Sequence, residues 1–192
     1  TDEPYRDLLI APAGFYAGLG VAGGDASVHV PTSVRRIWPE PARYPVTIGS
    51  VELEVELALT EFDRTRGLMW RRAIAPGTGM LFAFPEAQPR SFWMMNCFFD
   101  QSIAYIGANR RVLRVADQRH PLLPGQDPGA QGRDARPSTV REIQQEQTLS
   151  GGPAQYVLEV EQGWFARHGI EADARLQWSA VGEQMLQANG LR

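Results

Sequence analysis

The chain contains no lysine, because all nineteen of its basic residues are arginines. Schiff-base catalysis and lysine nucleophiles both need that side chain, so both classes of enzyme are excluded. The single cysteine, Cys97, excludes an internal disulfide and a metal site built from several thiolates. The formal net charge of −3 offers no basic face, so we expect no nucleic-acid partner.

Histidines are few and long apolar runs are missing. His29, His120 and His168 show no metal-ligand spacing, so we expect no metal site and no cofactor. No window of 18 residues is apolar throughout, so we expect no transmembrane helix and membrane contact only through a partner. The sequence also lacks the glycine fingerprints of nucleotide-binding loops and of serine hydrolases. We therefore assign no catalytic residue.

Proline placement divides the chain. Eleven of the fourteen prolines lie in residues 1–45 and 119–153. Because proline interrupts helices and central strands, we predict an N-terminal arm over 1–45 and a long internal loop over 119–153. The loop interrupts a single domain that we place at 46–179. An apolar pattern at helical spacing predicts a short C-terminal helix over 180–192.

The remaining segments show mostly two-residue periodicity. In "VELEVELALT" (51–60) apolar residues alternate with glutamates, which predicts a half-buried strand with one wet face. Glu159 and Glu161 share this spacing in "YVLEVEQ" (156–162), and we read them as solvated too. Further strands are predicted at 79–85, 91–99, 102–108, 110–117 and 174–179.

Two short helical segments accompany the strands. Thr60 and Asp63 resemble a capping box, so a helix should begin there, with Phe62 and Met69 on its inner face. A single helical turn is predicted in "GWFARHG" (163–169). We infer an α+β fold that is mostly β, a compact antiparallel barrel-like sheet with short helices packed on it.

Four motifs occur together in a specific order: R-G-L-M, G-M-L-F-x-F, F-W-M and Y-V-L-E-x-x-x-G-W. With these motifs the chain resembles domain-of-unknown-function family 192, over residues 46–118 and 154–178. The resemblance implies a small β-barrel-like α+β fold, frequent export and no settled activity. Where the family typically has lysine, threonine and aspartate, this chain has Met95, Cys97 and Ser102. Loss of both charges is expected if a Lys–Asp pair was dismantled.

The stretch "SFWMMNCFFD" (91–100) holds the candidate ligand site. Cys97 lies among large apolar residues, which predicts a buried and inert thiol. Trp93, Asn96 and Met69 are the candidate ligand-binding residues, since a tryptophan beside an asparagine can hold a planar ligand. One hypothesis for function is therefore a domain that binds a sugar or an anion, or a hydrolytic domain.

The apolar arm supports a different hypothesis. It carries aromatic residues that would serve as anchors on a partner, namely Phe15, Tyr16, Trp38 and Tyr44. We therefore expect first of all a non-catalytic accessory protein, docked by its arm onto a larger complex that is membrane-associated or free. The family habit and the missing initial methionine suggest an extracytoplasmic, periplasmic location.

Overall fold

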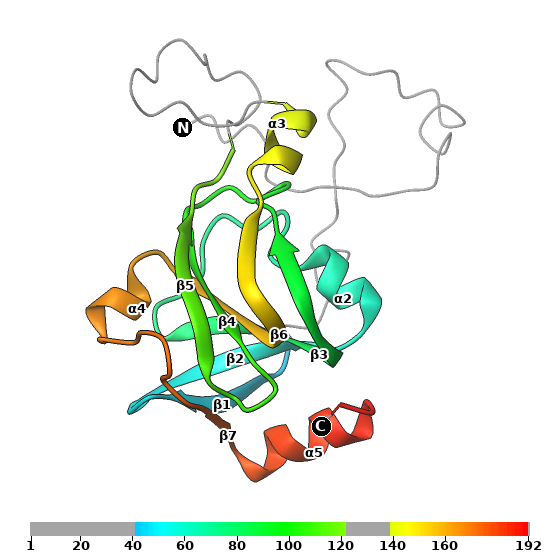
Figure 1. Ribbon diagram of the computed structural model, residues 1–192, viewed down its shortest axis with the longest axis vertical. Helices are drawn as coiled ribbons and strands as arrows, with labels where there is room; N and C mark the ends of the chain where they lie inside the picture. The colour runs from blue at the N-terminus through cyan, green and yellow to red at the C-terminus, as the bar shows by residue number, and fades with distance from the viewer. Residues whose placement is uncertain (1–40, 122–138, 192) are drawn as a thin grey trace, which may run out of the picture. The chain divides into compact units, whose positions relative to one another are not determined.

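The structure, a computed structural model, describes residues 41–121 and 139–191. Within these residues the strands form one curled sheet with the order β5-β4-β6-β3-β2-β1-β7 (Figure 1). The strands are β1 Arg43–Ile48, β2 Val51–Ala58, β3 Thr78–Phe92, β4 Gln101–Ile106, β5 Val112–Gln118, β6 Thr148–Glu161 and β7 Leu176–Trp178. The helices are α2 Glu61–Arg66, α3 Val140–Gln145, α4 Trp164–Arg167 and α5 Ala180–Ala188. The predicted mostly β fold with short helices is confirmed.

The sheet is antiparallel except at one place. β2 and β3 run parallel over Glu54–Ala58 and Thr78–Phe82, which differs from the expected all-antiparallel sheet. A parallel pair needs a long crossover, and the segment between the two strands supplies one with α2 in it. The other neighbouring strands pair antiparallel.

The two edges of the sheet approach each other, which produces the barrel-like curvature. The backbone N–H of Val112 donates to Ala174 O at 2.9 Å, and that of Leu176 donates to Arg110 O at 2.8 Å. A β-bridge joins Arg111 to Arg175 between them. The start of β5 is thus tied to the segment that leads into β7. Closure removes part of both exposed edges.

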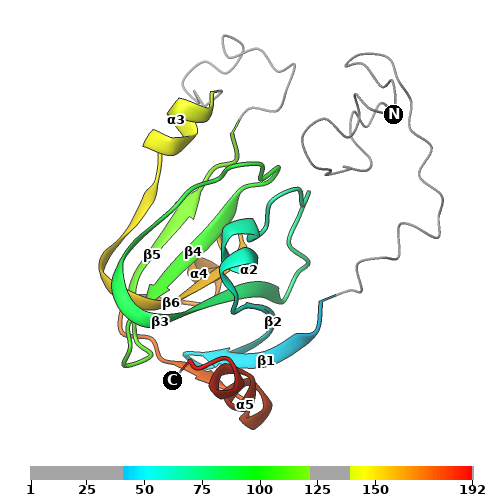
Figure 2. The same cartoon turned by 90° about the vertical axis from the view of Figure 1, so that its right-hand side faces the viewer.

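Each face of the sheet carries its own apolar cluster. The larger cluster includes Leu81, Leu158 and Tyr156 together with residues of α4 and α5. The smaller cluster, on the other face, includes Met80, Phe82 and Val157, and Leu68, Phe92 and Phe99 pack in it. Figure 2 shows α2 on the side of the sheet away from α5. Because β3, β4 and β6 are covered on both faces, alternation along them does not imply a wet face.

The predicted loop over 119–153 is wrong from residue 139 onward. α3 begins with a complete capping box formed by Thr139 and Glu142, and β6 already begins at Thr148. The prediction assumed that proline ends a strand, but Pro153 lies within β6, where it pairs with Pro89 of β3. β2 pairs with β3 only up to Phe82, so the part of β3 after Phe82 has a free edge. The missing N–H of Pro89 is tolerated there.

The other sequence predictions have mixed outcomes. Thr60 caps α2 as predicted, accepting from the Asp63 N–H at 3.1 Å, but Phe62 is 63% exposed and does not lie on an inner face. α4 and α5 are confirmed within the predicted segments. The arm boundary at 45 is wrong by a few residues, because β1 begins at Arg43 and needs its pairing with β2.

Candidate functional site

A small pocket opens between α2, the end of β3 and the segment 93–97. Its volume is about 40 Å³, and Glu159 of β6 contributes to its wall. The pocket is lined by Arg64, Thr65, Arg66, Gly67, Leu68, Met69, Phe82, Phe92, Trp93, Met95, Cys97 and Glu159. A space of this size accommodates a few water-sized groups. The wall therefore combines aromatic rings, sulfur-bearing side chains, two arginines and one buried carboxyl group.

The segment 93–97 is not the buried strand that the sequence predicted. β3 ends at Phe92, and the chain then turns, with the Cys97 N–H donating to Met94 O at 3.2 Å. Asn96 has a φ of 56°, in the left-handed region where asparagine is enriched among non-glycine residues. Its carbonyl accepts from the Trp70 N–H at 2.7 Å, which ties this segment to the one after α2. Local backbone geometry therefore explains why an asparagine interrupts the apolar run.

The structure brings the three predicted ligand-binding residues together. Trp93 and Met69 line the pocket, and Trp93 is 37% exposed. Asn96 is not in the wall, but its Nδ2 lies 3.9 Å from Met69 Sδ. Whether they bind a ligand stays a prediction.

Of the four predicted partner-binding residues, only Tyr44 lies in the described part of the chain. It sits half-buried in β1, opposite Val55 of β2. Phe15, Tyr16 and Trp38 lie outside the described residues, as does His29.

Glu159 is the residue that the sequence analysis missed. It was read as solvated, yet its side chain is only 4% exposed. Its Oε1 accepts from Gln101 Nε2 at 2.8 Å, and the same nitrogen donates to Gln118 Oε1 at 3.0 Å. Burial raises the pKa of Glu159 to about 8, against the lowering effects of the Gln101 hydrogen bond and of Arg71. The carboxyl group is therefore mostly protonated at neutral pH.

The mainly apolar sequence around Glu159, in "YVLEVE", was the signal for its burial. A strand flanked by a neighbour on each side and covered on both faces reads as a nearly continuous apolar run. The alternation of Glu159 and Glu161 pointed instead to a wet face, and it is correct only for Glu161, which remains partly exposed. Glu56 of β2 is a second exception to the predicted wet face, since it is buried and bound by Arg71.

Cys97 is buried as predicted, with 5% of its surface exposed. Burial, and to a lesser extent the charge of Glu159, raises the pKa of the thiol to about 12. Its Sγ donates to Met95 O at 3.6 Å. The thiol is thus neutral at physiological pH and lacks the thiolate that nucleophilic attack requires.

Sequence and structure comparisons identify the fold family. The DUF192 family, described as "Uncharacterized ACR", matches residues 44–178. The chain belongs to this family. None of the curated proteins that were compared matches the chain. Among the residues described by the structure, no helix is long and apolar enough to span a membrane.

Two crystal structures have similar folds. A "putative transcription regulator" from Sinorhizobium meliloti 1021 is 27% identical, with 72% of this chain and 95% of that chain covered and a TM-score of 0.56. A protein of unknown function from Novosphingobium aromaticivorans DSM 12444 is 24% identical, with 79% and 100% covered and a TM-score of 0.56. This second likeness concerns the fold alone. Both agree with a DUF192 domain made of the curled sheet and its short helices.

The three residues that the sequence analysis set against the family motif, Met95, Cys97 and Ser102, lie in two separate places. Met95 and Cys97 line the pocket. Ser102 is not in the pocket wall: its hydroxyl donates to Asp117 and accepts from the Gly163 N–H at 2.8 Å, just before α4. Asp117 is the cross-strand partner of Ser102, so a carboxylate is present there in any case. In this chain positions 95 and 102 therefore do not form one pair.

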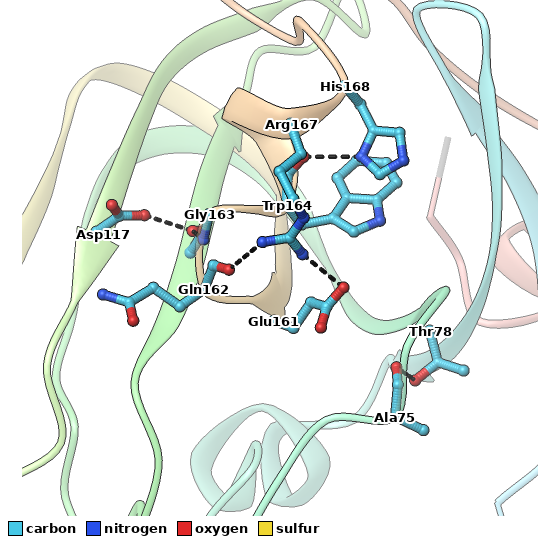
Figure 3. A network of polar contacts seen from close by, with 10 residues as sticks. Ala75, Thr78, Asp117, Glu161, Gln162, Gly163, Trp164, Arg167 and His168 are labelled. Carbon is cyan, nitrogen blue, oxygen red and sulfur yellow. Dashed lines mark hydrogen bonds and ion pairs between the residues drawn. The ribbon is translucent and has the colours of Figure 1, made fainter.

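The described histidines have structural partners. His168 Nδ1 lies 2.9 Å from Trp164 O, which holds the end of α4 (Figure 3), and His120 Nδ1 lies 2.7 Å from Asp100 Oδ1. Arg167, the neighbour of His168 in α4, is held by Glu161 at 2.6 Å. Within the described ranges, no group of three or more His, Cys, Asp or Glu side chains is placed to hold a metal ion. These four residue types do not include methionine, whose thioether also binds some metal ions.

Proposed function

We propose that the DUF192 domain of this chain is a non-catalytic binding module that holds a small ligand in the pocket beside Glu159. The observation that carries the proposal is a carboxyl group, 4% exposed, that borders an open pocket and receives one side-chain hydrogen bond, from Gln101. A buried polar group with spare hydrogen-bonding capacity is costly unless it has a partner. A ligand in the pocket would supply that partner.

The composition of the wall limits what the ligand can be. The wall also contains Arg64 and Arg66, but Arg64 donates to Leu59 O and Ala83 O, and Arg66 is paired with Asp63. Beside Glu159 itself, a protonated carboxyl donates and accepts hydrogen bonds and an ionised one attracts a cation, so an anion is the least favoured class there. The volume of about 40 Å³ is too small to enclose a sugar ring. We therefore favour a small cation or a small uncharged polar group over the sugar and anion ligands expected from sequence.

The neutral state of Cys97 supports binding rather than hydrolysis. A thiol with a pKa near 12 needs a strong base before it can attack, and no histidine belongs to the pocket wall in the described part of the chain. Glu159 is itself mostly protonated at neutral pH and is a poor base there.

Nuclear magnetic resonance titration of the full chain tests the proposal. Methylammonium, acetamide and acetate are the probes, because each is small enough for the pocket. Probes of two to four heavy atoms bind at best weakly, in roughly the millimolar range, which chemical-shift perturbation detects. We expect the first two to shift the amide resonances of residues 93–97 and of Glu159, and acetate to shift them least.

Variants make this test specific. Glu159→Gln cannot ionise when the cation binds and should remove the response to methylammonium, whereas Glu54→Gln, at an exposed residue of β2, should not change it. The proposal is contradicted if no probe perturbs these resonances, or if Glu159→Gln responds like the unmodified chain.

The arm-docking hypothesis concerns a different part of the protein. Its residues, apart from Tyr44, lie outside the described range, so its support is the aromatic content of the arm. Deleting residues 1–40, which leaves β1 intact, should abolish co-purification with a partner and leave the domain folded. Fractionation of the native host tests the extracytoplasmic location. Normal co-purification of the truncated protein would contradict arm docking.

A further inference from the structure

Sulfur is concentrated around the pocket. The chain has five methionines and one cysteine, and Met69, Met95 and Cys97 all line this one small space. Three of the six sulfur-bearing residues of the chain therefore share one wall.

The backbone holds these sulfur-bearing segments in fixed relation. The Trp70 N–H donates to Asn96 O at 2.7 Å, which joins the segment of Met69 to that of Met95 and Cys97. The Asn96 side chain lies 3.9 Å from Met69 Sδ, and Cys97 Sγ lies 3.6 Å from Met95 O. Met69 thus comes from one segment of the pocket wall, and Met95 and Cys97 come from the segment that is hydrogen-bonded to it.

The chemistry of the wall selects a particular kind of cation. Thioether and thiolate sulfur are soft ligands that favour Cu(I), whereas Mg²⁺ and Ca²⁺ require several oxygen ligands. The wall offers a single carboxyl group, that of Glu159, which is too few for the hard cations. The small volume suits a bare ion better than an organic cation with its own substituents.

We propose that the pocket binds one Cu(I) ion through the sulfur atoms of Met69, Met95 and Cys97. This inference rests on the proposed function, since it names the ligand of the same pocket. On binding, a Cu–S bond forms as the S–H bond of Cys97 breaks, the proton leaves to solvent, and copper remains in the +1 state. Glu159 lies beside the site as an adjacent oxygen donor.

The alternative is that the sulfur atoms only fill space. Methionine packs well against aromatic rings, and Phe82, Phe92 and Trp93 are in the same wall. A packing role predicts no copper affinity and little effect of replacing a methionine by leucine. The two interpretations therefore differ in a measurable way.

The test is an anaerobic titration of the full chain with Cu(I), kept reduced by ascorbate and competed by a bicinchoninate chelator. We expect one tightly bound ion per chain, and X-ray absorption should show sulfur neighbours at the copper. Met69→Leu, Met95→Leu and Cys97→Ser should each weaken binding, by on the order of tenfold or more. Met185→Leu, which removes a thioether on α5 outside the pocket, is the matched control and should bind normally.

Folding of each variant is checked by circular dichroism. If Cys97→Ser does not fold, the two leucine variants still test the proposal, because they nearly preserve side-chain volume. The proposal is overturned if the folded chain fails to retain Cu(I) against the chelator, or if the Met69 and Met95 variants bind as tightly as the Met185 control. If methylammonium still perturbs the pocket while Cu(I) does not bind, the copper inference fails and the binding function stands. If neither binds, both fail.

Discussion

Two buried glutamates lie on the same face of the sheet, and the fold accommodates them differently. Glu56 on β2 is 5% exposed and Glu159 on β6 is 4% exposed. Met80 of β3 pairs with both, so the three residues form one row across the sheet. Glu56 receives both terminal nitrogens of Arg71, at 2.7 and 2.5 Å. Glu159 receives a single amide hydrogen bond from Gln101, at 2.8 Å.

The comparison shows two ways to bury a carboxyl group. Arg71 gives Glu56 a bidentate counter-charge, the strongest geometry for such a pair. Glu159 lacks a cation at contact distance among the described residues, so burial raises its pKa to about 8 and the group keeps its proton. Only the second arrangement borders the pocket. A site for a cation requires a carboxyl group that is not already paired, and Glu159 meets that condition.

The largest expected effect concerns the pH dependence of stability in the metal-free protein. The folded state keeps the Glu159 proton up to about pH 8, whereas the usual value for glutamate is 4.5. Between these pH values the folded state binds more protons than the unfolded state. The contribution of Glu159 to the free energy of unfolding therefore falls as pH rises. The slope is at most about 1.4 kcal/mol per pH unit, or up to about 4 kcal/mol between pH 5 and pH 8.

Urea unfolding at several pH values checks this expectation. Glu159→Gln should remove the downward slope and be more stable than the unmodified chain at pH 8. Glu54→Gln changes an exposed carboxylate on β2 and should keep the slope. Equal slopes in Glu159→Gln and the unmodified chain would mean that Glu159 titrates normally.

The second effect comes from breaking the other arrangement. Arg71→Met leaves Glu56 buried without its counter-charge and should lower the free energy of unfolding by about 2–3 kcal/mol at pH 7. This is below the range for a fully buried pair because the Arg71 side chain is 32% exposed. In the double variant Glu56→Gln/Arg71→Met most of the loss should be recovered.

A surface pair provides the control for that experiment. Arg66 lies 3.7 Å from Asp63 and is 38% exposed, so Arg66→Met should change stability by less than about 1 kcal/mol. If Arg71→Met costs no more than Arg66→Met, the Glu56–Arg71 pair does not stabilise the fold and the contrast between the two glutamates disappears.

Much of the fold could be predicted because periodicity and capping are local. The strand at 51–60 and the capped helix at Thr60 depend only on neighbouring residues, and both are present. The extension of β3 and β6 could not be predicted in this way. Whether a strand tolerates Pro89 or Pro153 depends on which edge is free, and the strand order decides that.

The candidate site was only half predictable for the same reason. Trp93 and Met69 stood out by residue type, and the fold brings them into one wall. Glu159 was misread because alternation along a strand reports burial only when one face is open to water. Its contact with Gln101 depends on the register between β4 and β6, which no local pattern specifies.

The smallest expected effect concerns the segment 93–97, which contributes to the pocket wall, and it separates a backbone role for Asn96 from a ligand role. Asn96 has a positive φ, so Asn96→Ala should cost about 1 kcal/mol of stability, whereas Asn96→Gly should be nearly neutral because glycine adopts this conformation freely. Both variants remove the amide near Met69 Sδ. If pocket binding survives in Asn96→Gly but weakens in Asn96→Ala, the backbone turn positions the pocket. Equal losses of binding in two folded variants would instead make the Asn96 side chain part of the site.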